Sequence, residues 1–117
     1  MIRLLAVALL TFASVTFAKA PESVDPALAP WFHGLKNQIS GISCCDMADG
    51  HILADSDWRA GPDGYEVRIA EKWFALTPDR VLNGVSNPTG RAVLFYGAGA
   101  AEVGLAEIYC FVRPSEG

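Results

Sequence analysis

Three cysteines constrain the fold of this chain more than any other feature of its sequence. Cys44 and Cys45 are adjacent, within the stretch SCCDMADGH, and Cys110 lies close to the C-terminus. A disulfide from either of the first two to Cys110 would close a loop of about 65 residues, which loop-entropy arguments value at roughly 4 kcal/mol of stability. A bond between the adjacent pair would form a strained ring. The sequence leaves all three pairings open, and each leaves one cysteine unpaired.

The N-terminus has the pattern of a secretory signal peptide. A single basic residue, Arg3, precedes an uncharged, mostly apolar stretch over residues 4–18. A helix of that length would span roughly 22 Å, short of the ~30 Å hydrocarbon core of a bilayer. Small residues offer cleavage after Ala18 or after Ala20, and the first is preferred because a proline would follow the second cut. An uncleaved membrane anchor is the rival interpretation.

The signal peptide predicts both the compartment of the protein and the division of the chain into segments. We expect residues 1–18 to be the signal peptide, residues 19–30 an extended tether that contains three prolines, and residues 31–117 a single small disulfide-tied domain. The protein would be periplasmic or secreted, and in such compartments a disulfide is the default state of a cysteine pair.

Charge and hydropathy disfavour two classes of partner. The formal net charge is −4, and the basic residues are scattered singly, so that nothing would attract a phosphate backbone. No second apolar stretch has the length of a membrane span, so we expect no span after signal cleavage. The expected partner is an unidentified protein or small ligand, and no nucleic acid.

The patterning predicts an α+β fold that is mainly β: a short N-terminal helix followed by a small antiparallel sheet or partly closed barrel of four to five strands. Trp31 and Leu35 lie one helical turn apart, and Asp25 or Pro30 would start that helix. Ser40-Gly41 should end it. The strands come after residue 58.

Alternation of apolar and polar residues predicts a hairpin in the middle of the chain. Residues 65–69 put apolar side chains on one face, a turn at Ala70-Glu71 follows, and residues 73–76 return. The hairpin is entered through the turn at residues 61–64. Pro78 then suits the first position of a single helical turn.

Two apolar strands are expected near the C-terminus, at residues 91–97 and 107–113, joined by a small-residue loop or bend. The last strand would place Ile108, Cys110 and Val112 on one face and Tyr109 and Phe111 on the other. Large apolar groups on both faces favour a central strand that is covered on each side. The aromatic side chains should dominate the core. Those predicted to lie in it are Trp31, Trp58, Tyr65, Trp73, Phe95 and Phe111.

The cluster that follows the cysteine pair is a candidate metal site. In an extended segment Cys44 and Cys45 would point to opposite sides, so that one could face Cys110 and the other the polar residues beyond it. The residues of this candidate site are Cys45, Asp46, Asp49 and His51. A thiolate, an imidazole and carboxylates would suit zinc or copper, although the spacing matches no strong zinc signature and no calcium loop. No cofactor is otherwise expected. The alternative is a structural disulfide, a capped turn and a surface histidine.

Catalysis has weaker support in the sequence. A nucleophile, a base and an orienting group could be written with Cys45, His51 and Asp49, but such groups normally come from distant segments. The chain has no nucleophile elbow, no phosphate-binding glycine loop and no C-x-x-C pair. We therefore favour a protein that is not an enzyme.

Three stretches resemble a family of small, mostly uncharacterised exported proteins of alphaproteobacteria. They are WFHGL at residues 31–35, SGISCCDMADGH at residues 40–51 and IYCFVRP at residues 108–114. The family pattern has the form W-F-x-x-L, C-C-D-x-A-D-C and a terminal C-F-V-P. This chain departs from it at Gly50, where the pattern has a third clustered cysteine. The resemblance implies export and a similar fold, and carries no known activity.

The sequence thus favours an exported, non-catalytic binding or structural domain of unknown ligand, stapled by one disulfide. The alternative is a metal-binding or metal-handling protein that uses the cluster around Cys45 and His51.

Overall fold

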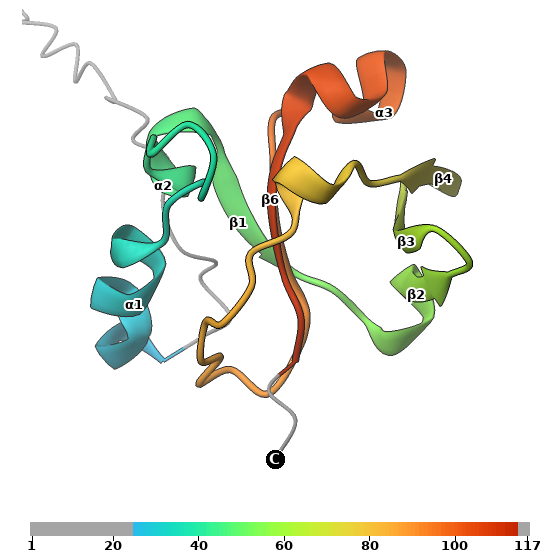
Figure 1. The fold of residues 1–117 in the computed structure, drawn as a ribbon. Helices are drawn as coiled ribbons and strands as arrows, with labels where there is room; N and C mark the ends of the chain where they lie inside the picture. Colours follow the sequence, from blue (N-terminus) through green and yellow to red (C-terminus); the bar gives the residue numbers. More distant parts are fainter. Residues whose placement is uncertain (1–24, 115–117) are drawn as a thin grey trace, which may run out of the picture.

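Two three-stranded antiparallel sheets frame the protein in a computed structural model that describes residues 25–114 (Figure 1). The first sheet has the order β1–β5–β6, with β1 at Asp49–Ile52, β5 at Val93–Tyr96 and β6 at Ile108–Val112. The second has the order β2–β3–β4, with β2 at Trp58–Gly61, β3 at Gly64–Ile69 and β4 at Lys72–Ala75. The predicted α+β, mainly β, fold class is confirmed, with two small sheets in place of a barrel.

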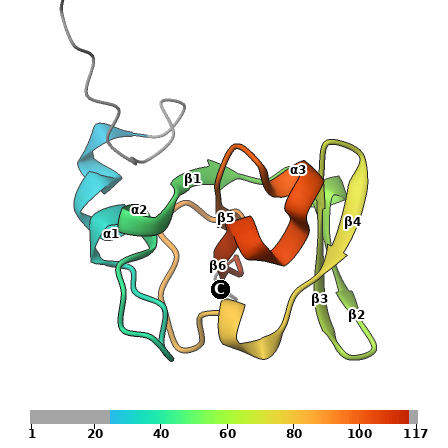
Figure 2. The same cartoon turned by 90° about the horizontal axis from the view of Figure 1, so that it is seen from above.

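Short helices fill the connections between the strands. The α-helices are α1 (Ala29–Gly34), α2 (Cys44–Met47) and α3 (Ala100–Val103). The 3-10 turns are η1 (Pro26–Leu28), η2 (Asp55–Asp57), η3 (Pro78–Arg80) and η4 (Gly104–Glu107). Figures 1 and 2 show α1 and α2 on one side of the first sheet and the second sheet on its other side. In the described residues, no helix has the length and apolar character needed to cross a membrane.

The N-terminal helix begins where the sequence predicts. Asp25 accepts a hydrogen bond from the backbone N–H of Ala27 at 2.9 Å, and Pro26 occupies the first position of the 3-10 turn that leads into α1. Residues 26–30 are therefore helical and not an extended tether, because the Asp25 cap and a proline in the first turn favour a helical start. The expected signal peptide and the rest of the tether lie outside the described residues.

The disulfide joins Cys44 to Cys110, with the two Cα atoms 6.0 Å apart. It ties α2 to strand β6 of the first sheet. Of the three pairings that the sequence left open, the structure has this one, and Cys45 is a free, buried thiol.

The two faces of the first sheet bury two separate clusters. Phe95, Cys110 and Val112 pack toward α1 and α2, together with Phe32. Leu94 and Phe111 pack toward the second sheet, together with Val67 and Ile69 of β3. Alternation along β5 explains the division, because neighbouring residues of a strand point to opposite faces.

The last strand, β6, is covered on both faces as its sequence predicts, but it is not the central strand. It lies at one edge of the first sheet, and β5 is central. Apolar residues on both faces of a strand show that both faces are buried, and they do not fix its place in the strand order. The backbone of Phe111 is partly paired on the outer side as well, through an isolated bridge to Val81.

A bulge in β6 changes one of the predicted faces. Phe95 pairs with Cys110, but Tyr96 pairs with Ile108, so that Tyr109 is an extra residue. Such an insertion shifts the alternation by one position. Ile108 therefore packs in the cluster of Phe111, and not with Cys110 as the alternation predicted.

The predicted core aromatics differ in burial. Phe95 and Phe111 are fully buried, whereas Trp31, Trp58 and Tyr65 are half-buried at the edges of the two clusters. Trp73 does not lie in the core: its side chain is 37% exposed. It sits on the edge strand β4, whose Phe74 points inward instead. The Trp73 ring covers the guanidinium of Arg59 at 3.8 Å.

Two further expectations need correction. The small-residue stretch 98–106, expected to be a loop or bend, contains α3 and most of η4, because the alanines favour helix and Gly104 ends it with a φ of +65°. The strands were expected only after residue 58, whereas residues 49–52 already form strand β1. Gly50 suits this position of β1, because an added Cβ would lie within 3.3 Å of the rings of Phe95 and Phe32.

Candidate functional site

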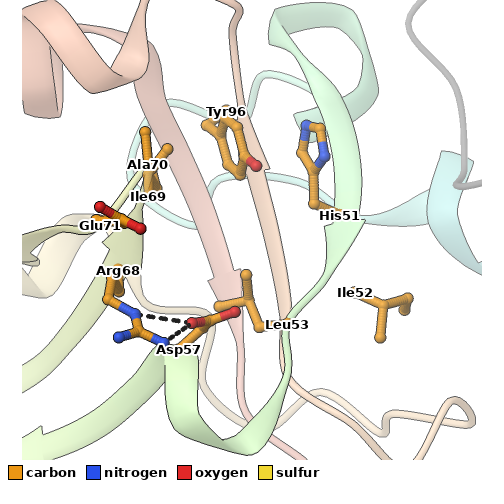
Figure 3. A pocket seen from close by; sticks show the side chains of 9 residues that line it. All are labelled: His51, Ile52, Leu53, Asp57, Arg68, Ile69, Ala70, Glu71 and Tyr96. Atoms are coloured by element: carbon orange, nitrogen blue, oxygen red, sulfur yellow. Dashed lines mark hydrogen bonds and ion pairs between the residues drawn. The ribbon is translucent and has the colours of Figure 1, made fainter.

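A cleft of about 520 Å³ opens between the two sheets (Figure 3). One wall comes from β1 and β5, and the other from β3 and the turn that follows it. The lining residues are His51, Ile52, Leu53, Asp57, Arg68, Ile69, Ala70, Glu71 and Tyr96. The volume lies within the range of small-molecule sites, and ionisable side chains meet in the cleft from separate segments of the chain.

His51 and Tyr96 form a stacked pair at one wall of the cleft. Their ring centroids lie 3.8 Å apart, with 12° between the ring planes. Burial lowers the pKa of His51, against the opposing effects of a hydrogen bond to the backbone of Tyr96 and of the Asp49 carboxylate. Burial also raises the pKa of Tyr96, and the charge of Asp57 adds to this. Both rings are therefore neutral at pH 7.

An ion pair crosses the base of the cleft. Arg68 donates from Nε and Nη2 to the same carboxylate oxygen of Asp57, at 2.9 and 2.7 Å. Arg68 lies on β3 and Asp57 ends the 3-10 turn that precedes β2, so that the pair joins the strand to the turn (Figure 3). About a third of each side chain is exposed, so solvent screens the attraction between the two charges. We therefore assign the ion pair the role of holding the Arg68 and Asp57 side chains in place in the cleft.

The hairpin turn at the rim of the cleft is strained. Ala70 and Glu71 have φ values of +49° and +67°, and in the described residues they alone among non-glycine residues have positive φ. Two-residue hairpin turns of this handedness normally use Asn-Gly or Asp-Gly. Each non-glycine residue in this region costs on the order of 1 kcal/mol. Strain of this kind concentrates at functional sites, which marks the turn as a feature to explain.

Glu71 gives the cleft its net charge. Asp57 is neutralised by Arg68, His51 is neutral, and within residues 25–114 no cation pairs with the Glu71 carboxylate. Glu71 itself is exposed at the rim, on the wall that also carries Arg68 (Figure 3). The cleft therefore combines one uncompensated negative charge with a stacked aromatic pair, which suits a small cationic ligand.

The structure does not bring the four residues of the predicted metal site together. Cys45 is buried, and its thiol lies 3.2 Å from the carbonyl oxygen of Phe32. Asp46 and Asp49 are exposed, and His51 stacks in the cleft. In the part of the chain that the structure describes, no group of three or more His, Cys, Asp or Glu side chains could hold a metal ion. Binding of zinc or copper stays a prediction.

The physical reason is the helical conformation of the cysteine pair. Cys44 and Cys45 begin α2, and successive side chains on a helix point only about 100° apart, whereas in an extended segment they would be opposite. Both sulfur atoms therefore turn inward, and Cys45 faces α1 and not the carboxylates. Burial raises the pKa of Cys45 to about 11, with further contributions from Asp46 and Asp49.

Of the residues that line the cleft, the sequence points only to His51, and it assigns this residue to the predicted metal site. Asp57, Arg68, Glu71 and Tyr96 are not among the sequence-based candidates. The signal that could have found the cleft is the turn Ala70-Glu71, which joins two well-patterned strands without glycine or asparagine. A tight hairpin turn without either residue is expected to be strained, and strain of this kind points to function.

Comparisons with models of known protein families, with curated proteins and with solved structures find no match to this chain.

Proposed function

We propose that the chain is an exported, non-catalytic binding domain that holds a small polar ligand with a protonated amine in the cleft between its sheets. The observation that carries the proposal is the carboxylate of Glu71, which has no cationic partner within residues 25–114 and is held by a strained turn on the cleft wall opposite the His51–Tyr96 stack. The strained turn holds the Glu71 side chain at the rim of the cleft, in a position that an unstrained turn would not give it.

Three observations support export to the periplasm or the extracellular space. The N-terminal sequence has a basic start followed by an apolar stretch. A disulfide between Cys44 and Cys110 is typical of oxidising compartments. The resemblance to small exported alphaproteobacterial proteins, carried by the C-C-D-x-A-D stretch and the terminal strand, agrees with both.

A protonated amine fits the cleft better than an anion does. An anion would meet Glu71 and would have to compete with Asp57 for the guanidinium of Arg68. An ammonium group could pair with the charge of Glu71 and approach the aromatic rings of the stacked pair. Rigid walls help, because the ion pair and the stack are formed without a ligand.

The test is a titration of the purified, oxidised protein with putrescine, followed by NMR shifts of backbone amides. Putrescine is expected to shift the signals of residues 51, 57, 71 and 96, whereas 1,4-butanediol, its neutral counterpart, leaves them in place. Glu71→Gln should weaken putrescine binding by about threefold or more, the effect of one partly solvated charge.

Glu102→Gln is the matched control, because Glu102 is an exposed acid on α3 that does not line the cleft. It should bind putrescine as the parent protein does. Equal binding of putrescine and butanediol, or equal loss in the two variants, would show that the cleft does not recognise the amine.

A further inference from the structure

A second pocket, of about 480 Å³, lies apart from the cleft and shares no lining residue with it. Trp58 and Tyr65 contribute from the β2–β3 hairpin, and Arg113 and Pro114 from the end of β6. The loop that follows η3 closes the pocket with Leu82, Gly84 and Val85. Three separate parts of the chain thus enclose a space large enough for a small organic molecule.

The pocket has a preformed aromatic wall. The rings of Trp58 and Tyr65 lie 6.2 Å apart, and each packs on the fully buried ring of Phe111, at 6.0 and 5.5 Å. Contact with the buried ring of Phe111 holds both rings near these positions before any ligand arrives, and leaves room for small rotations. An apolar ligand body would therefore meet a preformed surface and would not have to order it.

Arg113 supplies the charge of this pocket. It is the one charged residue among those that line the pocket, and its Nη1 donates to the Tyr65 hydroxyl at 3.0 Å. No carboxylate pairs with Arg113 in the described part of the chain. Guanidinium groups bind carboxylates through two parallel hydrogen bonds, so that an unpaired arginine at an apolar wall selects for such a ligand.

The indole N–H of Trp58 adds a second polar feature. This nitrogen is buried, and it has no hydrogen-bond partner in the part of the chain that the structure describes. Trp31 offers the contrast, because its indole N–H donates to the backbone oxygen of Ser86 at 2.7 Å. An unsatisfied buried donor destabilises the fold, and a ligand oxygen brought to it by a small rotation of the ring would remove that cost.

From these features we infer that the pocket binds a small organic carboxylate with an apolar, planar or branched body. Arg113 takes the carboxylate, Trp58 and Tyr65 take the body, and the Trp58 N–H donates to an oxygen of the ligand. The charge preference is opposite to that of the cleft, and no residue is shared. Each site can therefore fail its test while the other passes.

The experiment is an NMR titration of the purified, oxidised protein with phenylacetate, with phenylacetamide as its neutral counterpart. Phenylacetate should move the Trp58 indole N–H signal downfield and leave that of Trp73 in place, whereas phenylacetamide should bind about tenfold more weakly because it cannot form the charged pair. Putrescine should not shift the Trp58 signal.

Three variants separate recognition from folding. Arg113→Gln should weaken phenylacetate binding about tenfold or more, and Arg113→Lys should lose less than this, because it retains the charge but not the two parallel hydrogen bonds. Trp58→Phe keeps an aromatic ring but removes the orphaned donor, so it should weaken phenylacetate binding. As a control, Arg91→Gln, which changes an exposed arginine outside the pocket, should bind as the parent does.

Two results would overturn the inference. One is equal affinity for phenylacetate and phenylacetamide in the parent protein. The other is unchanged phenylacetate affinity in both Arg113→Gln and Trp58→Phe. If Arg113→Gln does not fold, the comparison of Trp58→Phe with the parent and of the two ligands still decides the question.

Discussion

The Cys45 sulfur atom lies 3.2 Å from the carbonyl oxygen of Phe32. The residue before it, Cys44, forms the disulfide with Cys110. The thiol is buried between α2 and α1, and its pKa is raised to about 11. The thiolate is the reactive form of cysteine, so this residue should be inert in the folded protein. We expect iodoacetamide to modify Cys45 at neutral pH only after unfolding in urea, as read from intact mass. Rapid modification of the folded protein would contradict the buried position.

The same shift predicts a loss of stability in alkaline solution. The pKa of Cys45 is higher in the folded state than its ordinary value of 9.0, so that the unfolded chain releases this proton first. The contribution of the protonated Cys45 thiol to the free energy of unfolding is therefore complete below pH 9 and is lost as the pH rises toward 11. Urea unfolding of the parent and of Cys45→Ala across this range measures it. The variant should show the smaller dependence on pH.

The Cys44–Cys110 bond should supply a large part of the stability of so small a domain. It closes a loop with a sequence separation of 66 residues. Replacing both cysteines with alanine should lower the free energy of unfolding by roughly 4 kcal/mol on the loop-entropy model. Cys45→Ala is the control, because it removes a thiol and leaves the bond. A loss in the double variant no larger than that in the control would mean that the bond contributes little.

Gly50 is placed where a side chain does not fit. An added Cβ would lie 3.1 Å from a ring carbon of Phe95 and 3.3 Å from one of Phe32. Overpacking of this kind typically costs about 1–3 kcal/mol, which is what we expect Gly50→Ala to lose in urea unfolding. Gly34→Ala is the matched control: it lies in α1 with no atom within 4 Å of the added carbon, and should gain about 0.5–1 kcal/mol. Similar losses in both would contradict the packing argument.

The parts of the fold that could be predicted from the sequence are those fixed by neighbouring residues. The β3–β4 hairpin follows from the alternation along its strands, and the Asp25 cap from side-chain chemistry next to a proline. By contrast, β1 carries an acid, a glycine and a histidine, and it is a strand because it pairs with β5, which lies far along the chain. The sequence of β1 alone contains no such information.

The candidate cleft depends even more on distant contacts. His51 was visible as a functional candidate, but its neighbours in sequence suggested a metal site, whereas its neighbour in space is Tyr96. Asp57 and Arg68 come from different segments, and neither side chain stands out in a linear reading. The bulge at Tyr109 determines on which face of the first sheet Ile108 lies, and no sequence pattern predicts this bulge.

The strained turn should show a trade between stability and binding. Ala70→Asn with Glu71→Gly introduces the residue pair that prefers this turn, so that the free energy of unfolding should rise by about 1–2 kcal/mol. The same change removes the carboxylate and should weaken putrescine binding as Glu71→Gln does. The replacement Ala70→Asn alone separates the effects, because it relieves strain and leaves Glu71 in place. If the double variant is no more stable than the parent, the positive φ values are not strained.

His51 gives the cleft an acid-sensitive element. Burial lowers its pKa below the ordinary value near 6.5, so that the unfolded chain takes up this proton first as the pH falls. The stability associated with neutral His51 is therefore present above about pH 6.5 and is lost as the pH drops through the lower pKa of the folded state. Protonation would also place a second cation in the cleft with Arg68 and oppose the binding of an amine.

We expect acidification from about pH 7.5 to about pH 5 to lower the melting temperature of the parent more than that of His51→Gln. His33→Gln is the control, because His33 is exposed on α1 and lines neither pocket, and its melting temperature should follow the parent. Parallel curves for the parent and His51→Gln would show that the imidazole is not held in its neutral form by the cleft.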